Sequence, residues 1–364
     1  MIKPYNLQKG DKVAIVSLSL GLLGEESAKH ELEIGLKRIK EFGLVPVIMP
    51  NSLKGIEYLF NHPEERASDL KQAFLDDSIK AIITAIGGDD TYKLIPYLMN
   101  DKEFCDAVLT HPKIFIGFSD TTNNHLMFYR LGLKTFYGPC FIVDFAELDK
   151  EMLPYTRDCL EKLFLQEERF EIKSSPVWYL DRKSFGIDQI GVPRIEKKEE
   201  HGYEVLKGSG KVSGILYGGC IESFYDDFVG LTYQDMPEII NKYHIILEND
   251  EWNDKIFFIE PSEQKMSPEV LFSMLMEFKK RNIFKRIRGL IVGKSQDEAY
   301  YEEYKKVYLE VFNDLDTPIL YNVNFGHAFP RCIIPYGAKA VVDYDEKKII
   351  IDEPILEKRK ILKK

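Results

Sequence analysis

The chain has 364 residues, of which 45% are hydrophobic and 30% charged, and its formal net charge is −10 at pH 7. No apolar run reaches the roughly 18 residues that a membrane-spanning helix needs, and the acidic balance lacks the basic surface of a nucleic-acid-binding protein, so neither a membrane nor a nucleic acid is an expected partner. The five cysteines are scattered without a C-x-x-C pair, so the sequence predicts neither disulfides nor a zinc site. The N-terminus lacks the apolar core of a signal peptide, and both observations fit a cytoplasmic location.

The first half of the sequence alternates short β-branched runs with stretches of helical periodicity. Strands are predicted at 12–19, 45–49, 80–86 and 113–117, and helices at 25–42, 63–74, 91–99 and 120–131. This alternation predicts an α/β domain with a doubly wound, Rossmann- or flavodoxin-like parallel sheet.

The second half is expected to form another domain, because a chain of this length is long for one hydrophobic core. Strands are predicted at 212–217, 245–247, 256–259, 289–292 and 340–342, and a helix at 268–281, which indicates a strand-rich α/β domain. Residues 167–211 are charged and poorly periodic, as is typical of a linker or a substrate loop. The expected division is therefore an N-terminal domain at 1–166, this linker or substrate loop at 167–211, and a C-terminal domain at 212–364.

A serine follows the predicted strand 113–117 and precedes a predicted helix, in the segment Gly117–Thr121. A serine on a sharp strand-to-helix turn exposes its hydroxyl beside the backbone N–H groups that open the helix, and these can hold an oxyanion. Ser119 is therefore a candidate nucleophile. The alternative is that Ser119 or Asp120 caps the helix, and Thr121 stands where the hydrolase elbow has its second glycine.

Two glycines, Gly87 and Gly88, follow the predicted strand 80–86. The carboxyl ends of parallel strands meet at one edge of a sheet, so this turn and the turn at Ser119 are expected to face the same space. Glycine permits a positive φ and a close approach to a ligand, so the N–H groups of Gly88 and Asp120 are candidates for an oxyanion hole. The alternative for the glycine pair is an ordinary tight turn.

A nucleophilic serine needs a base and a carboxylate that orients the base. Among seven histidines, His327 is the best base candidate, because it lies in a loop bounded by Gly326 and Pro330; the alternative is a structural loop histidine. Glu260 and Glu248 each end a predicted strand, and the pattern alone does not separate them. Either acid could instead be a cap for the next helix.

Several motifs together resemble the serine LD-carboxypeptidases and the MccF-like microcin C self-immunity hydrolases, nearly end to end. They are the segments Thr84–Gly88, Ile116–Thr122, Phe136–Pro139, Asp254–Glu260, Gly289–Lys294 and His327–Gly337. The resemblance selects Glu260 over Glu248 and implies a Ser119–His327–Glu260 triad, with the backbone amides of Gly88 and Asp120 as the oxyanion hole. It further implies a mechanism without metal or cofactor, an N-terminal α/β domain with a second strand-rich domain, and a homodimer.

The resemblance implies two kinds of substrate. Members of the carboxypeptidase branch cut the L,D-amide before the terminal D-alanine of murein tetrapeptides. Members of the MccF-like branch cleave the bond between an aspartyl or other acyl group and an adenylate-like moiety, whose base stacks on an aromatic residue of the intervening loop. The long 167–211 segment and its aromatic pair Trp178 and Tyr179 favour the second branch, since base stacking is worth about 1–3 kcal/mol.

The expected substrate contacts are Gly87, Trp178, Tyr179, Cys220 and Lys294. Cys220 stands where the family usually has an asparagine, and a thiol cannot replace the donor and acceptor of an amide. Lys294, like Arg331, could hold a carboxylate or phosphate or could be a surface salt-bridge partner. A different class also remains open: a non-catalytic ligand-binding homologue that kept the scaffold.

Overall fold

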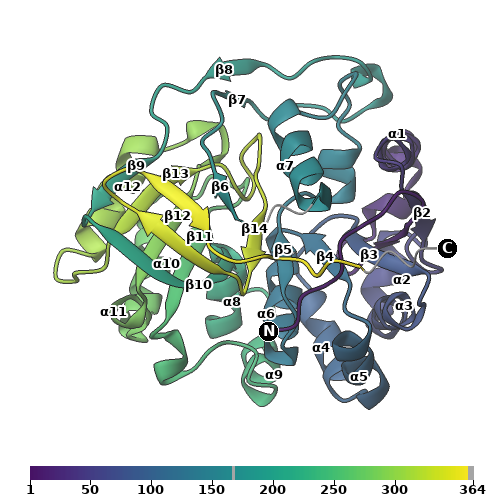
Figure 1. Cartoon of the computed structure of the whole chain (residues 1–364), viewed down its shortest axis with the longest axis horizontal. Coiled ribbons are helices and arrows are strands. Elements are labelled where there is room, and N and C mark those ends of the chain that lie inside the picture. The colour runs from purple at the N-terminus through teal and green to yellow at the C-terminus, as the bar shows by residue number, and fades with distance from the viewer. Residues whose placement is uncertain (166–168, 360–364) are drawn as a thin grey trace. The chain divides into compact units, whose positions relative to one another are not determined.

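The computed structural model describes residues 1–165 and 169–359, and the chain forms two compact units (Figure 1). The first unit contains residues 1–165, Ser184–Pro193 and 354–359, and the second contains Arg169–Lys183 and Arg194–Glu353. The boundary expected at 166–167 lies outside the described residues. The division into 1–166, 167–211 and 212–364 stays a prediction.

The first unit is built on a parallel sheet. Its strands are β1 (Lys12–Val16), β2 (Val45–Ile48), β3 (Ile79–Thr84), β4 (Ile114–Gly117) and β5 (Thr135–Tyr137). They are arranged in the order β2-β1-β3-β4-β5, and every pair is parallel. All residues of β4 are buried, as expected for a strand covered on both faces. The predicted parallel α/β sheet is confirmed.

Helices connect these strands. They are α1 (Lys29–Glu41), α2 (Ile56–Asn61), α3 (Pro63–Leu75), α4 (Ile95–Met99), α5 (Lys102–Thr110), α6 (Thr122–Leu131) and α7 (Pro154–Leu165). The predicted helix 91–99 is split into a 3₁₀ turn, Thr91–Leu94, and α4. Proline lacks an N–H and is tolerated in a first helical turn, so Pro96 favours the start of a new helix here. The predicted helix 25–42 likewise begins only at Lys29, after 3₁₀ turns.

The second unit contains an eight-stranded mixed sheet. Its order is β6 (Phe170–Ile172), β16 (Lys348–Ile351), β15 (Lys339–Asp343), β10 (Lys211–Cys220), β11 (Lys255–Glu260), β12 (Gly289–Gly293), β13 (Ile319–Val323) and β9 (Glu204–Lys207). The four central strands β10 to β13 are parallel, and the outer strands pair antiparallel. The predicted strand-rich second part is confirmed.

The remaining elements of the second unit complete its outline. They are β7 (Val177–Tyr179), β8 (Glu196–Lys198), β14 (Ile334–Tyr336), α8 (Ile221–Val229), α9 (Met236–Lys242), α10 (Pro268–Lys280), α11 (Ile283–Arg286) and α12 (Tyr301–Val311). Among the described residues, no helix combines the length and apolar character that crossing a bilayer requires.

The strand predicted at 245–247 is wrong. Ile245, Ile246 and Leu247 are buried but form an irregular segment after α9. The acid that follows them, Glu248, forms a capping box with Glu251 at the 3₁₀ helix Asn249–Trp252. The apolar run therefore reflects burial and not pairing in the sheet.

The segment predicted as a linker or substrate loop contains paired strands. β7 and β8 form a two-stranded antiparallel sheet, and β6 and β9 lie at opposite edges of the large sheet. The backbone N–H of Tyr179 donates to the carbonyl of Phe329 at 3.0 Å, and the guanidinium of Arg194 lies 3.7 Å from the centroid of the Phe329 ring. This part of the segment thus packs against the loop that carries His327.

An aromatic cluster supports the strands that end at the site. Tyr217 on β10 and Phe257 on β11 each contact the ring of Trp252, with centroids 5.2 Å apart in both pairs, and Phe224 packs edge-on against Phe257 at 5.4 Å. Such pairs contribute about 0.5–1.5 kcal/mol each beyond the burial of their area. The aromatic cluster therefore packs against β10 and β11 three residues before each strand ends.

Candidate functional site

Ser119 lies on a strained turn between β4 and α6. Its φ is +65°, a left-handed conformation that a non-glycine residue adopts at a cost of order 1–3 kcal/mol. The residue before it, Phe118, is fully extended, so the chain turns sharply at the serine. The backbone N–H of Ser119 donates to the hydroxyl of Tyr137 at 3.2 Å, which fixes the turn to the end of β5.

The glycine pair after β3 lies directly against this turn. A Cβ on Gly87 would come within 2.9 Å of the Ser119 hydroxyl, and a Cβ on Gly88, whose φ is +150°, would come within 2.2 Å of the Ser19 hydroxyl. Both positions therefore require glycine because the backbone approaches a side chain. An ordinary tight turn would not impose the restriction at Gly87.

Asp120 does not cap the helix that follows it. Its carboxylate accepts hydrogen bonds from the Ser19 hydroxyl at 2.6 Å and from the backbone N–H of Thr91 at 2.9 Å. Burial raises the pKa of Asp120 to about 6, and the nearby charge of Asp90 adds to this effect. Asp120 thus ties the serine turn to the loop that follows the glycine pair.

A second histidine, His125 on α6, supports the same turn. Its Nε2 lies 3.0 Å from the carbonyl of Gly117, and its Nδ1 lies 2.7 Å from the hydroxyl of Thr135. Burial lowers the pKa of His125 to about 4, so the ring is neutral near pH 7. In this state Nε2–H donates to the carbonyl and Nδ1 accepts from the hydroxyl, which makes His125 a structural residue.

In the second unit, Glu260 and His327 form a close pair. Nδ1 of His327 lies 2.9 and 3.1 Å from the two carboxylate oxygens, and the backbone N–H of His327 donates to the same carboxylate at 3.2 Å. Glu260 ends β11 and is fully buried. Glu248, the other acid that the sequence offered, contacts His244 at 3.0 Å instead.

Glycine at position 326 allows this pairing. Gly326 has a φ of +83°, and a Cβ there would lie 2.2 Å from the carboxyl carbon of Glu260. Arg331, which is fully buried, donates from its guanidinium to the carbonyl of His327 at 3.0 Å. Arg331 is therefore a buried brace of the histidine loop, and its interpretation as a surface salt-bridge partner is wrong.

The other ring nitrogen of His327 faces an acid that the sequence did not single out. Nε2 lies 3.1 Å from a carboxylate oxygen of Glu263, whose side chain is 56% exposed. Burial lowers the pKa of His327, but the charge and hydrogen bond of Glu260, with the charges of Glu263 and Glu222, outweigh it and raise the pKa above the ordinary 6.5. The one sequence signal for Glu263 is its place three residues after a strand-end acid.

Cys220 ends β10 directly beside Glu260 on β11. Its thiol donates to Glu222 at 3.2 Å, and the other oxygen of Glu222 accepts from the backbone N–H of Ser262 at 2.9 Å. Burial, together with the charges of Glu222 and Glu260, raises the pKa of the Cys220 thiol well above its ordinary value. The thiol is therefore protonated and is not a candidate nucleophile.

Lys294, at the end of β12, is buried with 1% of its side chain exposed. Its ammonium donates to Glu199 at 3.0 Å, to Glu298 at 2.5 Å and to Asn322 at 3.2 Å, so each of its three N–H groups has an acceptor. Lys294 is therefore a salt-bridge partner, as one alternative expected, but a buried one and not one at the surface. The ammonium also lies 5.1 Å from the centroid of the Trp178 ring, so Lys294 holds one of the two predicted aromatic residues.

The predicted site residues thus fall into two groups, each organised within its own unit. The first unit holds Gly87, Gly88, Ser119 and Asp120 around one strand-end turn. The second unit holds Cys220, Glu260 and Lys294 at the ends of β10, β11 and β12, His327 in the loop after β13, and Trp178 and Tyr179 on β7.

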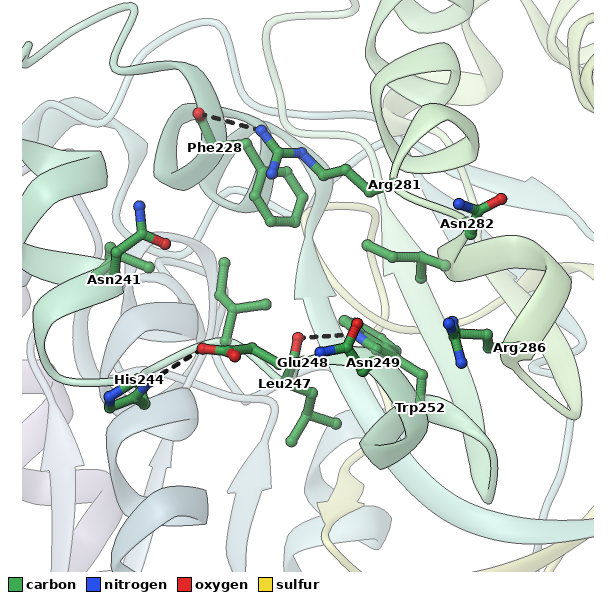
Figure 2. A pocket seen from close by; sticks show the side chains of 13 residues that line it. Phe228, Asn241, His244, Leu247, Glu248, Asn249, Trp252, Arg281, Asn282 and Arg286 are labelled. Atoms are coloured by element: carbon green, nitrogen blue, oxygen red, sulfur yellow. Dashed lines mark hydrogen bonds and ion pairs between the residues drawn. The ribbon is translucent and has the colours of Figure 1, made fainter.

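A cavity of about 190 Å³ in the second unit lies elsewhere (Figure 2). Its thirteen lining residues include none of the predicted site residues. The charged groups around it are paired: Arg281 donates to the carbonyl of Phe228 at 3.5 Å, His244 contacts Glu248, and Arg286 binds Asp250 at 2.6 Å. The side chains of His244 and Glu248 are 72% and 57% exposed, unlike the buried pair of His327 and Glu260, and no serine or cysteine is among the described residues that line this cavity.

Comparison with known proteins gives a consistent result. A model of the LD-carboxypeptidase N-terminal domain matches residues 13–138, and a model of the LD-carboxypeptidase C-terminal domain matches residues 213–342. The chain is 43% identical to an MccF-like protein from Streptococcus pneumoniae, whose crystal structure contains AMP; the superposition covers 94% of this chain and 99% of that one, with a TM-score of 0.90.

Two curated proteins represent the two branches of the resemblance. The microcin C7 self-immunity protein MccF of Escherichia coli is 29% identical over 305 residues, which are 82% of this chain and 80% of the relative. A Bacillus subtilis protein named "Probable murein peptide carboxypeptidase" is 27% identical over 363 residues, 98% of this chain and 96% of the relative. With both domain models matched in succession and a 43% identical relative covered almost completely, the chain belongs to the LD-carboxypeptidase family and is a carboxypeptidase-type serine hydrolase.

Proposed function

We propose that this hydrolase cleaves an amide bond in a small peptide or an aminoacyl or peptidyl nucleotide, such as a microcin C-like antibiotic, through a Ser119–His327–Glu260 triad. The observation that carries the proposal is the buried Glu260 carboxylate at 2.9 Å from Nδ1 of His327. A carboxylate in this position fixes the tautomer in which Nε2 can accept a proton. Ser119, on its strained turn, is the proposed nucleophile.

In the proposed reaction, the hydroxyl oxygen of Ser119 attacks the carbonyl carbon of the substrate amide and Nε2 of His327 takes the hydroxyl proton. The backbone N–H groups of Gly88 and Asp120 donate to the oxyanion of the tetrahedral intermediate. When the intermediate collapses, His327 gives the proton to the leaving nitrogen. Water then attacks the acyl-enzyme with His327 again as the base, which releases the acid and restores the serine.

An adenylate-type leaving group is favoured over a murein peptide. The 43% identical Streptococcus pneumoniae protein was solved with AMP, and the Escherichia coli relative is named for immunity to microcin C7. Trp178 and Tyr179, with Gly87 and Cys220, are the proposed substrate contacts. Lys294 is proposed to act through Trp178, because its own donors are already satisfied.

Cleavage of a murein tetrapeptide is the alternative substrate, supported by the Bacillus subtilis relative. A non-catalytic ligand-binding homologue is the alternative class. The strained φ of Ser119 speaks against this class, since binding alone does not require a strained serine.

The proposal extends to a cytoplasmic homodimer with the division into 1–166, 167–211 and 212–364. A reducing compartment is supported by the five cysteines, which are odd in number and scattered along the sequence without a C-x-x-C pair. Sedimentation equilibrium of the full chain tests the homodimer.

The test of the function is mass-spectrometric analysis of two candidate substrates, aspartyl sulfamoyl adenosine and a murein tetrapeptide, incubated with the wild type and with Ser119→Ala. We expect cleavage of the nucleotide conjugate by the wild type and a loss of at least about 10³-fold in the variant, because the nucleophile is absent. Release of D-alanine from the tetrapeptide alone would assign the chain to the murein branch. Failure of a fluorophosphonate probe to label Ser119, with no turnover of either compound, would support the binding protein.

A further inference from the structure

The ends of β10 and β11 bring together three different metal-binding side chains in the second unit. The Cys220 sulfur, a Glu260 carboxylate oxygen and a ring nitrogen of His327 all lie within 4.8 Å of one another, and all three residues are buried. Glu222 lies beside this group, with its Oε2 3.2 Å from the Cys220 sulfur.

We propose that this group is a Zn²⁺ site, formed by Cys220, Glu260 and His327, with a fourth position that water or a shifted Glu222 would fill. A tetrahedral site of thiolate, imidazole and carboxylate donors is typical of Zn²⁺, with bonds of about 2.0–2.3 Å. Mg²⁺ and Ca²⁺ prefer oxygen donors alone, so the sulfur and the imidazole select a softer ion. Such bonds put neighbouring ligand atoms about 3.5 Å apart, so shifts of about 1 Å would bring the donors of Cys220, Glu260 and His327 onto the ion.

The local charges favour a cation. Three carboxylates, those of Glu222, Glu260 and Glu263, and a thiol lie around a single imidazole, an arrangement that costs free energy unless the negative charges are compensated. At present the thiol donates to Glu222, the Ser262 N–H donates to the same carboxylate, and His327 donates to Glu260. On binding, Zn²⁺ would take the place of the thiol proton, which is released to solvent. It would also take the place of the Nδ1 proton between His327 and Glu260, and this proton would move to Nε2 of the same ring.

The ion would act as a reversible inhibitor. This consequence rests on the proposed function, in which His327 is the base. When zinc is bound to the His327 ring and the Glu260 carboxylate is withdrawn from Nδ1, the imidazole is no longer held in the tautomer that can accept a proton from Ser119. The sequence could not indicate this site, because its ligands are 107 residues apart at the extremes, Cys220 and His327, and no two follow a zinc-binding spacing.

The experiment uses the full chain after treatment with a chelator. Zn²⁺ is titrated in competition with a chromogenic chelator, and Co²⁺ is added separately to record the near-ultraviolet charge-transfer band that reports a cobalt–thiolate bond. We expect the wild type to bind one zinc ion per chain and to show the cobalt band. Ser119→Ala should give the same two results. In Cys220→Ser the zinc affinity falls by more than about 10-fold and the band disappears.

Two further variants make the result specific. Cys159→Ser, which removes a thiol on α7 of the first unit, is expected to change neither readout. Glu222→Gln is expected to weaken zinc binding but to keep the cobalt–thiolate band, and it provides a second variant if Cys220→Ser does not fold. Zinc binding and a cobalt band that survive in a folded Cys220→Ser protein would overturn the proposal, as would the lack of zinc binding by the wild type.

The outcomes separate this site from the proposed function. Zinc binding that depends on Cys220, in a protein that hydrolyses neither candidate substrate, would support the metal site while the proposed function fails. Hydrolysis that depends on Ser119 without zinc binding would refute the metal site and leave the proposed function intact. If the metal site and the proposed function are both supported, added zinc is expected to inhibit the wild type in proportion to the fraction of sites that it occupies. Inhibition of Cys220→Ser should need a zinc concentration more than about 10-fold higher.

Discussion

At the scale of single residues, His327 lies between two carboxylates with different environments. Glu260 is fully buried and holds Nδ1, whereas Glu263 is more than half exposed and lies 3.1 Å from Nε2. In the proposed reaction Nε2 must accept a proton from Ser119, so the Glu263 carboxylate has to move away when substrate binds. Because the Glu263 side chain is more than half exposed, moving it breaks few packing contacts and costs little free energy.

The pH dependence of the hydrolysis follows from the same pair. The base has to be neutral, and the surrounding carboxylates raise the pKa of His327 above 6.5, so kcat/KM is expected to fall as the pH drops through this raised pKa. Replacing Glu263 with Gln removes one negative charge that stabilises the imidazolium, which lowers the pKa of His327. The acidic limb of the kcat/KM profile should therefore move to lower pH in Glu263→Gln.

Glu57→Gln, a change on α2 of the first unit, is the matched control and should leave the profile in place. An acidic limb at the same pH in Glu263→Gln and the wild type would show that Glu263 does not interact with the base in solution.

At the scale of elements, eight of the sixteen strands in the described residues coincide with predicted strands, because an apolar run is visible in the local sequence. The runs that became β3, β4, β11 and β12 are continuous and apolar, as buried parallel strands are. The same signal was misleading at Ile245–Leu247, where three buried residues pack without pairing to a strand. A run of apolar residues indicates that a segment is buried. The segment is a strand only if its backbone also forms hydrogen bonds with a neighbouring strand.

The candidate site was partly predictable for a related reason. Ser119, Glu260 and His327 stand at the ends of elements or in loops with glycine, and the family motifs select them. Glu263 and the bond between Cys220 and Glu222 were missed because they depend on contacts between side chains, which no pattern along the chain records. The burial of Lys294 was missed for the same reason, since its partners Glu199 and Asn322 are distant in sequence.

The loop that carries His327 depends on one glycine. In Gly326→Ala the new methyl group would collide with the Glu260 carboxyl at 2.2 Å and would also strain a φ of +83°. We expect a loss of at least about 100-fold in kcat/KM, because a displaced base or carboxylate cannot orient the proton transfer. Steady-state kinetics of the full chain measure the loss of activity, and urea unfolding measures the loss of stability from the strained backbone.

Gly210→Ala gives the matched control in the same unit. Gly210 has a similar φ of +75°, but nothing lies within 4 Å of the position of a Cβ. This variant should show only the cost of a positive φ, about 1 kcal/mol, with full activity. Equal activity in the two variants would contradict the requirement for glycine beside Glu260.

At the scale of the whole molecule, the proposed catalytic groups are divided between the two compact units. The nucleophile and the oxyanion donors belong to the first unit, and the base, its carboxylate and the proposed aromatic contacts belong to the second. A substrate that uses all of them has to be held by both units at once. Binding is therefore expected to protect backbone amides in both units from hydrogen exchange, since a ligand suppresses every opening that breaks its site.

This expectation can be measured with Ser119→Ala, which should bind aspartyl sulfamoyl adenosine without cleaving it. At a ligand concentration about 100 times the Kd, openings that abolish binding become less favourable by about 2.7 kcal/mol, which slows exchange by about 100-fold where such openings limit it. We expect slower exchange after β3, at 87–91, and in the histidine loop, at 325–331. AMP alone serves as the comparison, because it lacks the acyl group that the catalytic residues contact, and it should protect the histidine loop less. Protection confined to the second unit with the full conjugate would mean that the ligand is held away from Ser119, and the proposed triad would then not act on this class of substrate.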